Sequence, residues 1–486
     1  MASNVAESQA VASAPARGLP KGAILVILFE FFERFGFYSL LSLLALFLTA
    51  SRMAGGFGWE QASALGVLGI YTGLMYALPA IGGYVADRIL GHRAAIVVGA
   101  VLMLSGYVLL ALIGILPAFF GASTAAAFAA LAVPLGSWTT PAGLNADLAS
   151  AYGLVTLCFW GALLCLVLGN ALFKSTMVIV LGDSFAPTDP RRDRAYAYYY
   201  MGINIGGFIA GIAAGSVAVS FGWHPAFAMS AVGIGIGLGA YSLLASRMLG
   251  PQRLAAESTE TAEAEVHVVQ RLLILALLAL LLCIYAIGHF QVYGTFSLFL
   301  EQHVDRHVGS FEIPTQWFTS VNALGLIIAA PVFAAIWHRL ARAGREPDII
   351  VKYAIALMMG GAGVLLFAWQ ASGAVEKPSW LMLALAILVI AAGEVAAWVS
   401  TYGIVYRLAP RRIVAAVMGA FYAITLGLGG YAAGGLGRFA GALGNTTYFV
   451  LLSLLMLGAA GAALLFRGKL RRFAAAHGAD LSANAK

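Results

Sequence analysis

Few ionisable residues lie deep within the apolar segments of this sequence, and five of them could do chemistry together. Glu30, Glu33 and Arg34 fall in the first apolar segment, and their i, i+3 and i+4 spacing places all three on one face of a helix. Lys174 is an isolated cation in a later segment, so we expect the glutamate pair to be its partner. Glu394 stands without a neighbouring charge in another apolar segment. Charges in such positions are costly and commonly mark substrate or proton pathways.

The types of these five side chains suit a solute that carries both charges. Arg34 and Lys174 could receive a carboxylate, and Glu394 could receive an ammonium group. A buried glutamate that is shared between cations becomes easier to protonate once its cationic partner leaves it. The set therefore offers a physical route to coupled movement of a proton and a solute. Residue types alone do not select peptides over other charged solutes.

A static ion network that fixes the register of the helices is the competing interpretation. We favour a functional site, because two carboxylates in excess and an unpaired glutamate would be a costly way to hold helices together.

The elements that must position these side chains are membrane-spanning helices. The 486 residues are 61% hydrophobic and 10% charged, with a mean hydropathy of +0.90, whereas a soluble domain carries about 25% charged residues. This composition predicts an all-α integral membrane protein with about twelve spans. We place the spans at residues 22–50, 61–86, 94–116, 154–182, 195–218, 224–247, 268–302, 316–338, 350–370, 379–406, 413–436 and 446–466.

The distribution of basic residues predicts the orientation. Most of the 28 Lys and Arg residues fall on one side of the expected helices, and only Arg52, Arg306, Lys377 and Arg438 fall on the other side. By the positive-inside rule both termini are cytoplasmic. This asymmetry explains the net charge of +7 without a nucleic-acid partner. The domains expected from this topology are an N-terminal tail 1–21, a bundle of six helices 22–247, a linker 248–267, a second bundle 268–466 and a C-terminal tail 467–486.

Residues 117–153 do not fit this pattern simply. Part of this stretch is apolar enough to span a bilayer, but a further span would invert the charge balance of every later loop. The stretch contains no Lys or Arg. We therefore expect an extracytoplasmic insertion with a re-entrant or surface helix.

Several segments resemble the proton-dependent oligopeptide transporter (POT) family of the major facilitator superfamily. The first helix contains EFFERFGFY (30–38), similar to the family motif E-x-x-E-R-F-x-Y-Y, and GGYVADRILGHR (82–93) is similar to its second-helix signature. The fourth and fifth helices contain G-N-x-L-F-K (169–174) and YMGINIGGF (200–208). The second half contains FEIPTQWFTSVN (311–322) and the pair Gly393-Glu394. A D-R-x-x-G loop alone would indicate only the superfamily.

The resemblance implies a major facilitator fold and a role for each matching residue. Glu30, Glu33, Arg34 and Lys174 would couple proton movement, and the two cations would also face the carboxylate of a peptide. The remaining implied substrate-binding residues are Tyr38, Tyr76, Asn204, Asn322 and Glu394, and the implied conformational motif contains Asp87 and Arg88. Packing aromatics are a competing interpretation for the two tyrosines, and helix–helix hydrogen bonding is one for Asn204.

The sequence departs from the family pattern at four places. Leu41 and Phe290 stand where many relatives carry an arginine and a glutamate that form an ion pair near the outer side. Glu301, at the outer end of the seventh helix, is a candidate substitute through another partner. Trp398-Val399 replaces a usual Ser-Pro, so the tenth helix should be straighter. The linker is too short for the two extra helices of many bacterial relatives.

We therefore expect a proton-coupled symporter that imports di- and tripeptides by alternating access. Its location would be a bacterial inner membrane, and it would act as a monomer with no cofactor besides protons. The nearest alternative is a proton-coupled carrier of a non-peptide charged solute on the same fold. An enzyme is disfavoured, because the sequence has no nucleophile–base pair, metal-spaced His/Cys cluster or phosphate-binding loop. Cys158, Cys165 and Cys283 lie in apolar runs and are expected to pack as small hydrophobic residues.

Overall fold

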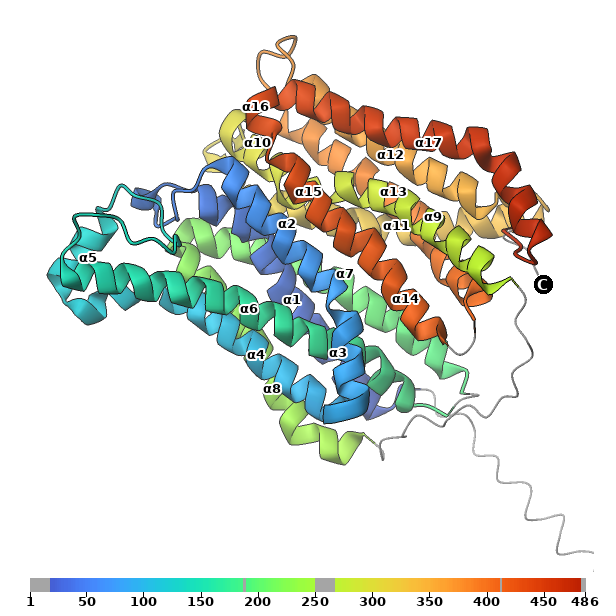
Figure 1. The fold of residues 1–486 in the computed structure, drawn as a ribbon, viewed down its shortest axis with the longest axis horizontal. Coiled ribbons are helices and arrows are strands. Elements are labelled where there is room, and N and C mark those ends of the chain that lie inside the picture. The colour runs from blue at the N-terminus through green and yellow to red at the C-terminus, as the bar shows by residue number, and fades with distance from the viewer. Residues whose placement is uncertain (1–17, 187–188, 250–266, 411–412, 482–486) are drawn as a thin grey trace, which may run out of the picture.

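A computed structural model describes residues 18–186, 189–249, 267–410 and 413–481, and this part of the chain is almost entirely helical (Figure 1). The N-terminal half contains the long helices α1 (Lys21–Thr49), α2 (Gln61–Ala77), α4 (His92–Leu112), α6 (Ala146–Asp183), α7 (Arg191–Phe221) and α8 (Trp223–Met248). The shorter elements of this half are η2 (Arg52–Ala54), α3 (Pro79–Val85), η3 (Ala86–Leu90), η4 (Leu116–Phe120) and α5 (Ala122–Ala129).

The C-terminal half repeats this plan. Its long helices are α9 (Val268–His289), α11 (Trp317–Arg342), α12 (Ile349–Gln370), α13 (Trp380–Leu408) and α17 (Asn445–Ala476). A further span consists of α14 (Val414–Tyr422), η7 (Ala423–Leu428) and α15 (Gly429–Gly437), and α9 continues through η5 (Phe290–Tyr293) into α10 (Thr295–His303). The hairpin of β1 (His307–Val308) and β2 (Phe311–Glu312) and the short helix α16 (Ala440–Leu443) complete the half.

The count of spans agrees with the expected fold class. Ten helices of the described residues are long and apolar enough to cross a membrane, and the pair α2 and α3 adds an eleventh, with a bend of 40° between its two parts. Proline at position 79 accounts for the bend, since it has no amide hydrogen and cannot continue a regular helix. Helix α1 has 29 residues and supplies a twelfth candidate, although it contains four ionisable side chains. The prediction of an all-α membrane protein is confirmed.

The stretch 117–153 contains most of η4, the short helix α5 and the beginning of α6. Helix α5 has eight residues, far fewer than the roughly 20 that cross a bilayer. Helix α6 then begins at Ala146, earlier than the expected 154, because the side chain of Asn145 accepts a hydrogen bond from the amide of Leu148 and caps it. The insertion is attached to its own half through Arg52, whose guanidinium donates to the carbonyl of Phe128 at 3.1 Å.

The C-terminal end differs from the prediction. Helix α17 continues to Ala476 rather than ending near 466, so most of the described part of the expected tail 467–486 is helical. The extension is held by the guanidinium of Arg467, which donates to Asp348 at 2.8 Å, and the amide of Ile349 donates to the carbonyl of Leu481 at 3.3 Å. Nearly all of the expected linker (250–266) and of the N-terminal tail (1–17) lie outside the described residues.

The two halves pack tightly at one end, where α2 lies against α15 and α7 lies against α11 (Figure 1). A Cβ atom placed on Gly69 of α2 would lie 2.8 Å from the Cα of Gly434 on α15. A Cβ atom on Gly211 of α7 would lie 2.5 Å from the hydroxyl oxygen of Thr319 on α11. At Gly69 only glycine permits this approach of two backbones, and at Gly211 a larger residue would collide with the hydroxyl of Thr319. In the expected topology this is the outer end, so the structure is closed there.

Candidate functional site

The first helix presents its three ionisable side chains to α6. Lys174 of α6 donates a hydrogen bond to Glu30, and Arg34 donates to both carboxylate oxygens of Glu33, at 2.6 Å for the Nη2–Oε1 contact. The Nε atom of Arg34 also lies 3.7 Å from Glu30, and its Nη2 donates to Asn170 at 3.0 Å. The expected contact between Lys174 and the glutamate pair is therefore present. The sequence did not single out Asn170.

The cluster is buried and balanced in charge. Glu30, Glu33 and Arg34 are at most 3% exposed, whereas the side chain of Lys174 is 27% exposed. Each carboxylate has a cationic partner, as buried ions require, so the expected excess of two carboxylates is wrong. Lys174 is the member of the cluster that a solute could reach first. A substrate carboxylate that binds Lys174 would weaken its contact with Glu30.

Glu394 of α13 has a partner that the sequence analysis missed. The Nδ1 atom of His289, on α9, lies 3.1 Å from the Oε2 atom of Glu394. The expectation that Glu394 is unpaired is therefore wrong. A signal was present in the sequence, because His289 directly precedes Phe290, the position where an acidic residue is missing. The contact joins two helices that are far apart in the sequence, so spacing could not reveal it.

Aromatic side chains from both halves meet beside these two groups. The ring of Tyr38 on α1 stacks on that of Tyr293 on η5, with centroids 6.3 Å apart, and the ring of Tyr76 on α2 lies 5.7 Å from that of Phe290. The ring of Tyr293 also lies 6.2 Å from that of His289. Tyr38 and Tyr76 thus form part of the contact between the halves. Their role in substrate binding stays a prediction.

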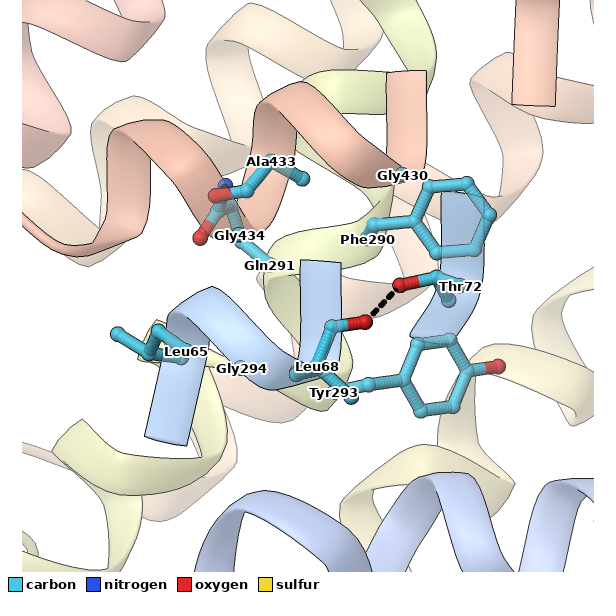
Figure 2. Close-up of a pocket in the computed structure, with 10 residues that line it drawn as sticks. All are labelled: Leu65, Leu68, Thr72, Phe290, Gln291, Tyr293, Gly294, Gly430, Ala433 and Gly434. Carbon is cyan, nitrogen blue, oxygen red and sulfur yellow. Dashed lines mark hydrogen bonds between the residues drawn. The ribbon is translucent and has the colours of Figure 1, made fainter. Parts of the chain in front are cut away.

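A small cavity lies where α2, η5 and α15 meet, and Figure 2 shows the residues around it. Its volume of about 10 Å³ is roughly the space for one water molecule, so it is too small for a solute. In Figure 2 a dashed line joins the hydroxyl of Thr72 to the carbonyl of Leu68, so this hydroxyl is bonded within its own helix. Gln291 crosses to α15 and donates to the carbonyl of Ala433 at 3.1 Å. The cavity belongs to the closed end.

The positions of the missing outer ion pair are filled by apolar packing. Leu41 is fully buried and Phe290 is 5% exposed. Glu301 does not replace the pair, because its carboxylate binds Arg306 at 2.5 Å and accepts a hydrogen bond from Thr315, both in the C-terminal half. This contact fixes the loop between α10 and α11 and does not join the halves. The closed end is held by close helix packing.

The remaining predicted residues lie in three different settings. The side-chain amide of Asn204 donates to the carbonyl of Tyr200 on its own helix at 2.9 Å. Asn322 is 2% exposed, and its amide nitrogen has no hydrogen-bond partner among the described protein groups, which leaves a buried donor unsatisfied. Asp87 lies 2.7 Å from His92, and both Asp87 and Arg88 are exposed on η3.

Helix α13 runs unbroken past Trp398, which agrees with the expected effect of replacing proline. The indole of Trp398 stacks on the ring of Tyr422, with centroids 5.4 Å apart. Among the described residues there is no group of three or more His, Cys, Asp or Glu side chains that could hold a metal ion.

Comparison with known proteins gives a consistent result. Residues 93–252 and 246–440 match the model of the POT family. A peptide transporter from Yersinia enterocolitica is 28% identical over 85% of this chain and 86% of its own length. Dipeptide and tripeptide permease A from Escherichia coli is 24% identical over 85% of this chain and 84% of its own. A crystal structure of a peptide transporter POT in complex with sulfate has a TM-score of 0.78 and 22% identity, covering 96% of this chain and 99% of that one. The overall fold agrees with the major facilitator architecture expected from the sequence.

Proposed function

Because the chain belongs to the POT family, a family of multi-pass membrane transporters and not of enzymes, we propose that it is a proton-coupled symporter of di- and tripeptides. The observation that carries this proposal is the pairing of Lys174 with Glu30 and of Arg34 with Glu33. Both cations able to receive a substrate carboxylate are held by a carboxylate of the protein. A substrate can bind them only if a glutamate is released, and a released buried glutamate favours its protonated form. Binding of substrate and of a proton are thereby linked.

The substrate carboxylate binds Lys174 first, since its side chain is the exposed part of the cluster, and then Arg34. The amino terminus binds Glu394, whose side chain is 20% exposed. The buried amide of Asn322 supplies a donor for a backbone carbonyl. In this arrangement Asn204, Tyr38 and Tyr76 line the substrate site, as the family motif implies.

Transport proceeds by alternating access. The close contacts of Gly69 with Gly434 and of Gly211 with Thr319 hold together one end of the two halves, which is the outer end in the proposed orientation, and they separate when the halves rock around the site. The exposed motif of Asp87 and Arg88 lies on η3, which follows α2 and α3 and is remote from Gly69 along this span. Both termini face the cytoplasm of a bacterial inner membrane, and protons are the coupling ion. The ion-pair cluster and Glu394 lie within one chain, so a monomer is sufficient.

A carrier of a non-peptide charged solute is the second candidate. It is favoured by Leu41, Phe290 and Trp398, which replace the usual residues near the site with apolar or bulky side chains. Arg34, Lys174 and Glu394 would bind any solute that carries both a carboxylate and an amino group.

Uptake of labelled dialanine into proteoliposomes, with and without an inward proton gradient, tests the proposal. We expect accumulation that depends on the gradient and is competed by tripeptides but not by free alanine. Absence of uptake by protein shown to be folded would overturn the peptide function and favour the second candidate.

A further inference from the structure

The partner of Glu394 can carry a positive charge under physiological conditions. His289 is the ionisable base nearest to Glu394 in the described part of the chain, with its Nδ1 atom 3.1 Å from the carboxylate. Histidine is the side chain that gains and loses its charge between about pH 5 and 8. The contact is therefore a full ion pair only when the imidazole is protonated. A neutral imidazole leaves the carboxylate free for another cation.

The other titratable groups around Glu394 are phenols. Those that interact with it electrostatically are Tyr38, Tyr76, Tyr200, Tyr285, Tyr293 and Tyr402. Phenols are neutral at physiological pH, so they do not compete for the carboxylate as cations. The hydroxyl of Tyr285 is already bonded to the carbonyl of Ile390.

The other helices that pack against α9 bring no free cation to His289 among their described residues. Lys352 on α12 donates to Glu346 and Ser400 at 2.7 Å each. The hydroxyls of Tyr353 on α12 and of Tyr422 on α14 bond with Thr401 and Tyr402, and the ring of Tyr448 on α17 packs on Phe449. Among the described residues, the carboxylate of Glu394 is therefore the charged group that lies against His289.

The contact between His289 and Glu394 is close but not well aligned. Neither His289 Nδ1 nor Glu394 Oε2 has a hydrogen bond of acceptable geometry with any described group, although the two atoms are 3.1 Å apart. His289 is 9% exposed and the side chain of Glu394 is 20% exposed. The contacting atoms themselves are buried, so an incoming cation would approach the exposed part of the Glu394 side chain, and it can replace the imidazole without breaking a strong hydrogen bond.

We propose that His289 is a specificity-determining residue that competes with the amino group of the substrate for Glu394. The inference rests on the proposed function. It deepens that function by naming the residue that sets the preference for substrates with a free cationic amino group. When the ammonium binds Glu394, the imidazolium loses its counter-ion and releases one proton to solvent water, which leaves a neutral imidazole. Protonation of His289 therefore opposes binding of the amino group, whereas protonation of Glu30 or Glu33 favours binding of the carboxylate. A fall in pH therefore weakens binding of the amino group at Glu394 and strengthens binding of the carboxylate at Arg34 and Lys174.

The test is equilibrium binding of two peptides to the full chain in lipid nanodiscs, between about pH 5.5 and 7, where the amino group of dialanine stays protonated. Dialanine carries the ammonium group, and N-acetyl-dialanine lacks it but keeps the carboxylate. The ratio of the two dissociation constants cancels effects of Glu30 and Glu33, which act on the shared carboxylate. In the unmodified protein the preference for dialanine should decline as pH falls, by at most about tenfold per pH unit for one released proton.

Two substitutions at His289 should act in opposite directions. His289→Asn cannot become cationic, so the preference for dialanine should be high and independent of pH in this range. His289→Lys keeps a cation beside Glu394, so the preference should be low even at about pH 7. His303→Asn is the matched control, because His303 is exposed at the end of α10 and contacts Phe299, and it should behave as the unmodified protein. If His289→Asn does not fold, His289→Lys alone decides the question.

The outcomes separate this inference from the proposed function. A pH-dependent preference that persists in His289→Asn would show that Glu394 itself titrates, and would overturn the role of His289. A change of the preference for dialanine in the same direction in both variants would indicate that His289 acts only through packing. It would also overturn the role of His289 as a competitor for Glu394. Failure of the unmodified protein to bind either peptide would instead overturn the peptide function, and this inference with it.

Discussion

Lys174 of α6 donates a hydrogen bond to Glu30 of α1, a residue 144 positions earlier in the chain. This contact joins the cation that a solute can reach to a carboxylate that is fully buried. Because neither charge can lose its partner without cost in a membrane protein, a change at one residue must alter the other. The relationship is the basis of the first prediction.

Replacing Lys174 with alanine should abolish gradient-driven uptake of dialanine. The change removes a cation for the substrate and leaves Glu30 without its hydrogen-bonded partner. The free energy of unfolding should fall by about 1–3 kcal/mol, which is less than for a fully buried pair because Lys174 is 27% exposed. Uptake and thermal unfolding measure the two effects. The double variant Lys174→Ala/Glu30→Gln should regain stability but not transport. Concentrative uptake by Lys174→Ala would contradict the coupling role.

Replacing Glu33 with glutamine should separate exchange from proton-driven transport. Glutamine keeps the shape of the side chain near Arg34 but cannot take up a proton in place of the carboxylate. We expect exchange of labelled for unlabelled dialanine across the membrane to persist, while accumulation driven by a proton gradient is lost. Counterflow and gradient-driven uptake in the same proteoliposomes measure this difference. Equal loss of both activities would indicate that Glu33 has only a structural role.

Gly434→Ala should disturb the closed end, and Gly435→Ala provides a matched control. A Cβ atom on Gly434 would lie 2.4 Å from the Cα of Gly69, whereas one on Gly435 would meet nothing within 4 Å. Both changes raise helix propensity by the same amount, about 1 kcal/mol. The difference in uptake between the two variants therefore reports on the packing of α2 against α15. We expect uptake to fall in Gly434→Ala and to stay unchanged in Gly435→Ala.

The conformational part of this prediction can be measured by labelling. Thr72→Cys, in a background in which Cys158, Cys165 and Cys283 are replaced by serine, places a thiol beside the small cavity at this end. A membrane-impermeant thiol reagent should label it faster when Gly434 is alanine. Equal rates in the Gly434→Ala and Gly435→Ala backgrounds would argue against closure by this contact.

Replacing Glu301 with glutamine should leave uptake within about twofold of that of the unmodified protein. The side chain of Glu301 is 49% exposed, and its ion pair with Arg306 lies within one half of the protein. Exposed ion pairs contribute about 0–1 kcal/mol to the free energy of unfolding. Initial uptake rates across several dialanine concentrations measure the effect. A large fall in the maximal rate with unchanged stability would restore Glu301 as a gating residue.

The sequence by itself determined the local features of this protein. The lengths of the apolar segments predicted the spans, and the ends of most helices agree with the structure to within a few residues, as for α1 and α12. The i, i+3 and i+4 spacing predicted that Glu30, Glu33 and Arg34 share a face. The need of an isolated buried cation for a partner led to the contact of Lys174 with the glutamate pair. Each inference used only composition, spacing within one helix, or a cost that any buried charge incurs.

Only the tertiary structure decided which helices meet and at what rotation. The pair of His289 with Glu394 and the approach of Gly69 to Gly434 depend on helix packing, and no spacing along the chain encodes them. The early start of α6 and the extension of α17 depend on a cap at Asn145 and on Asp348, groups outside the apolar segments. A membrane helix is defined by its own residues, because all its backbone hydrogen bonds are internal. Its partners are set by side-chain contacts with distant segments, and these appear only when the whole chain is folded.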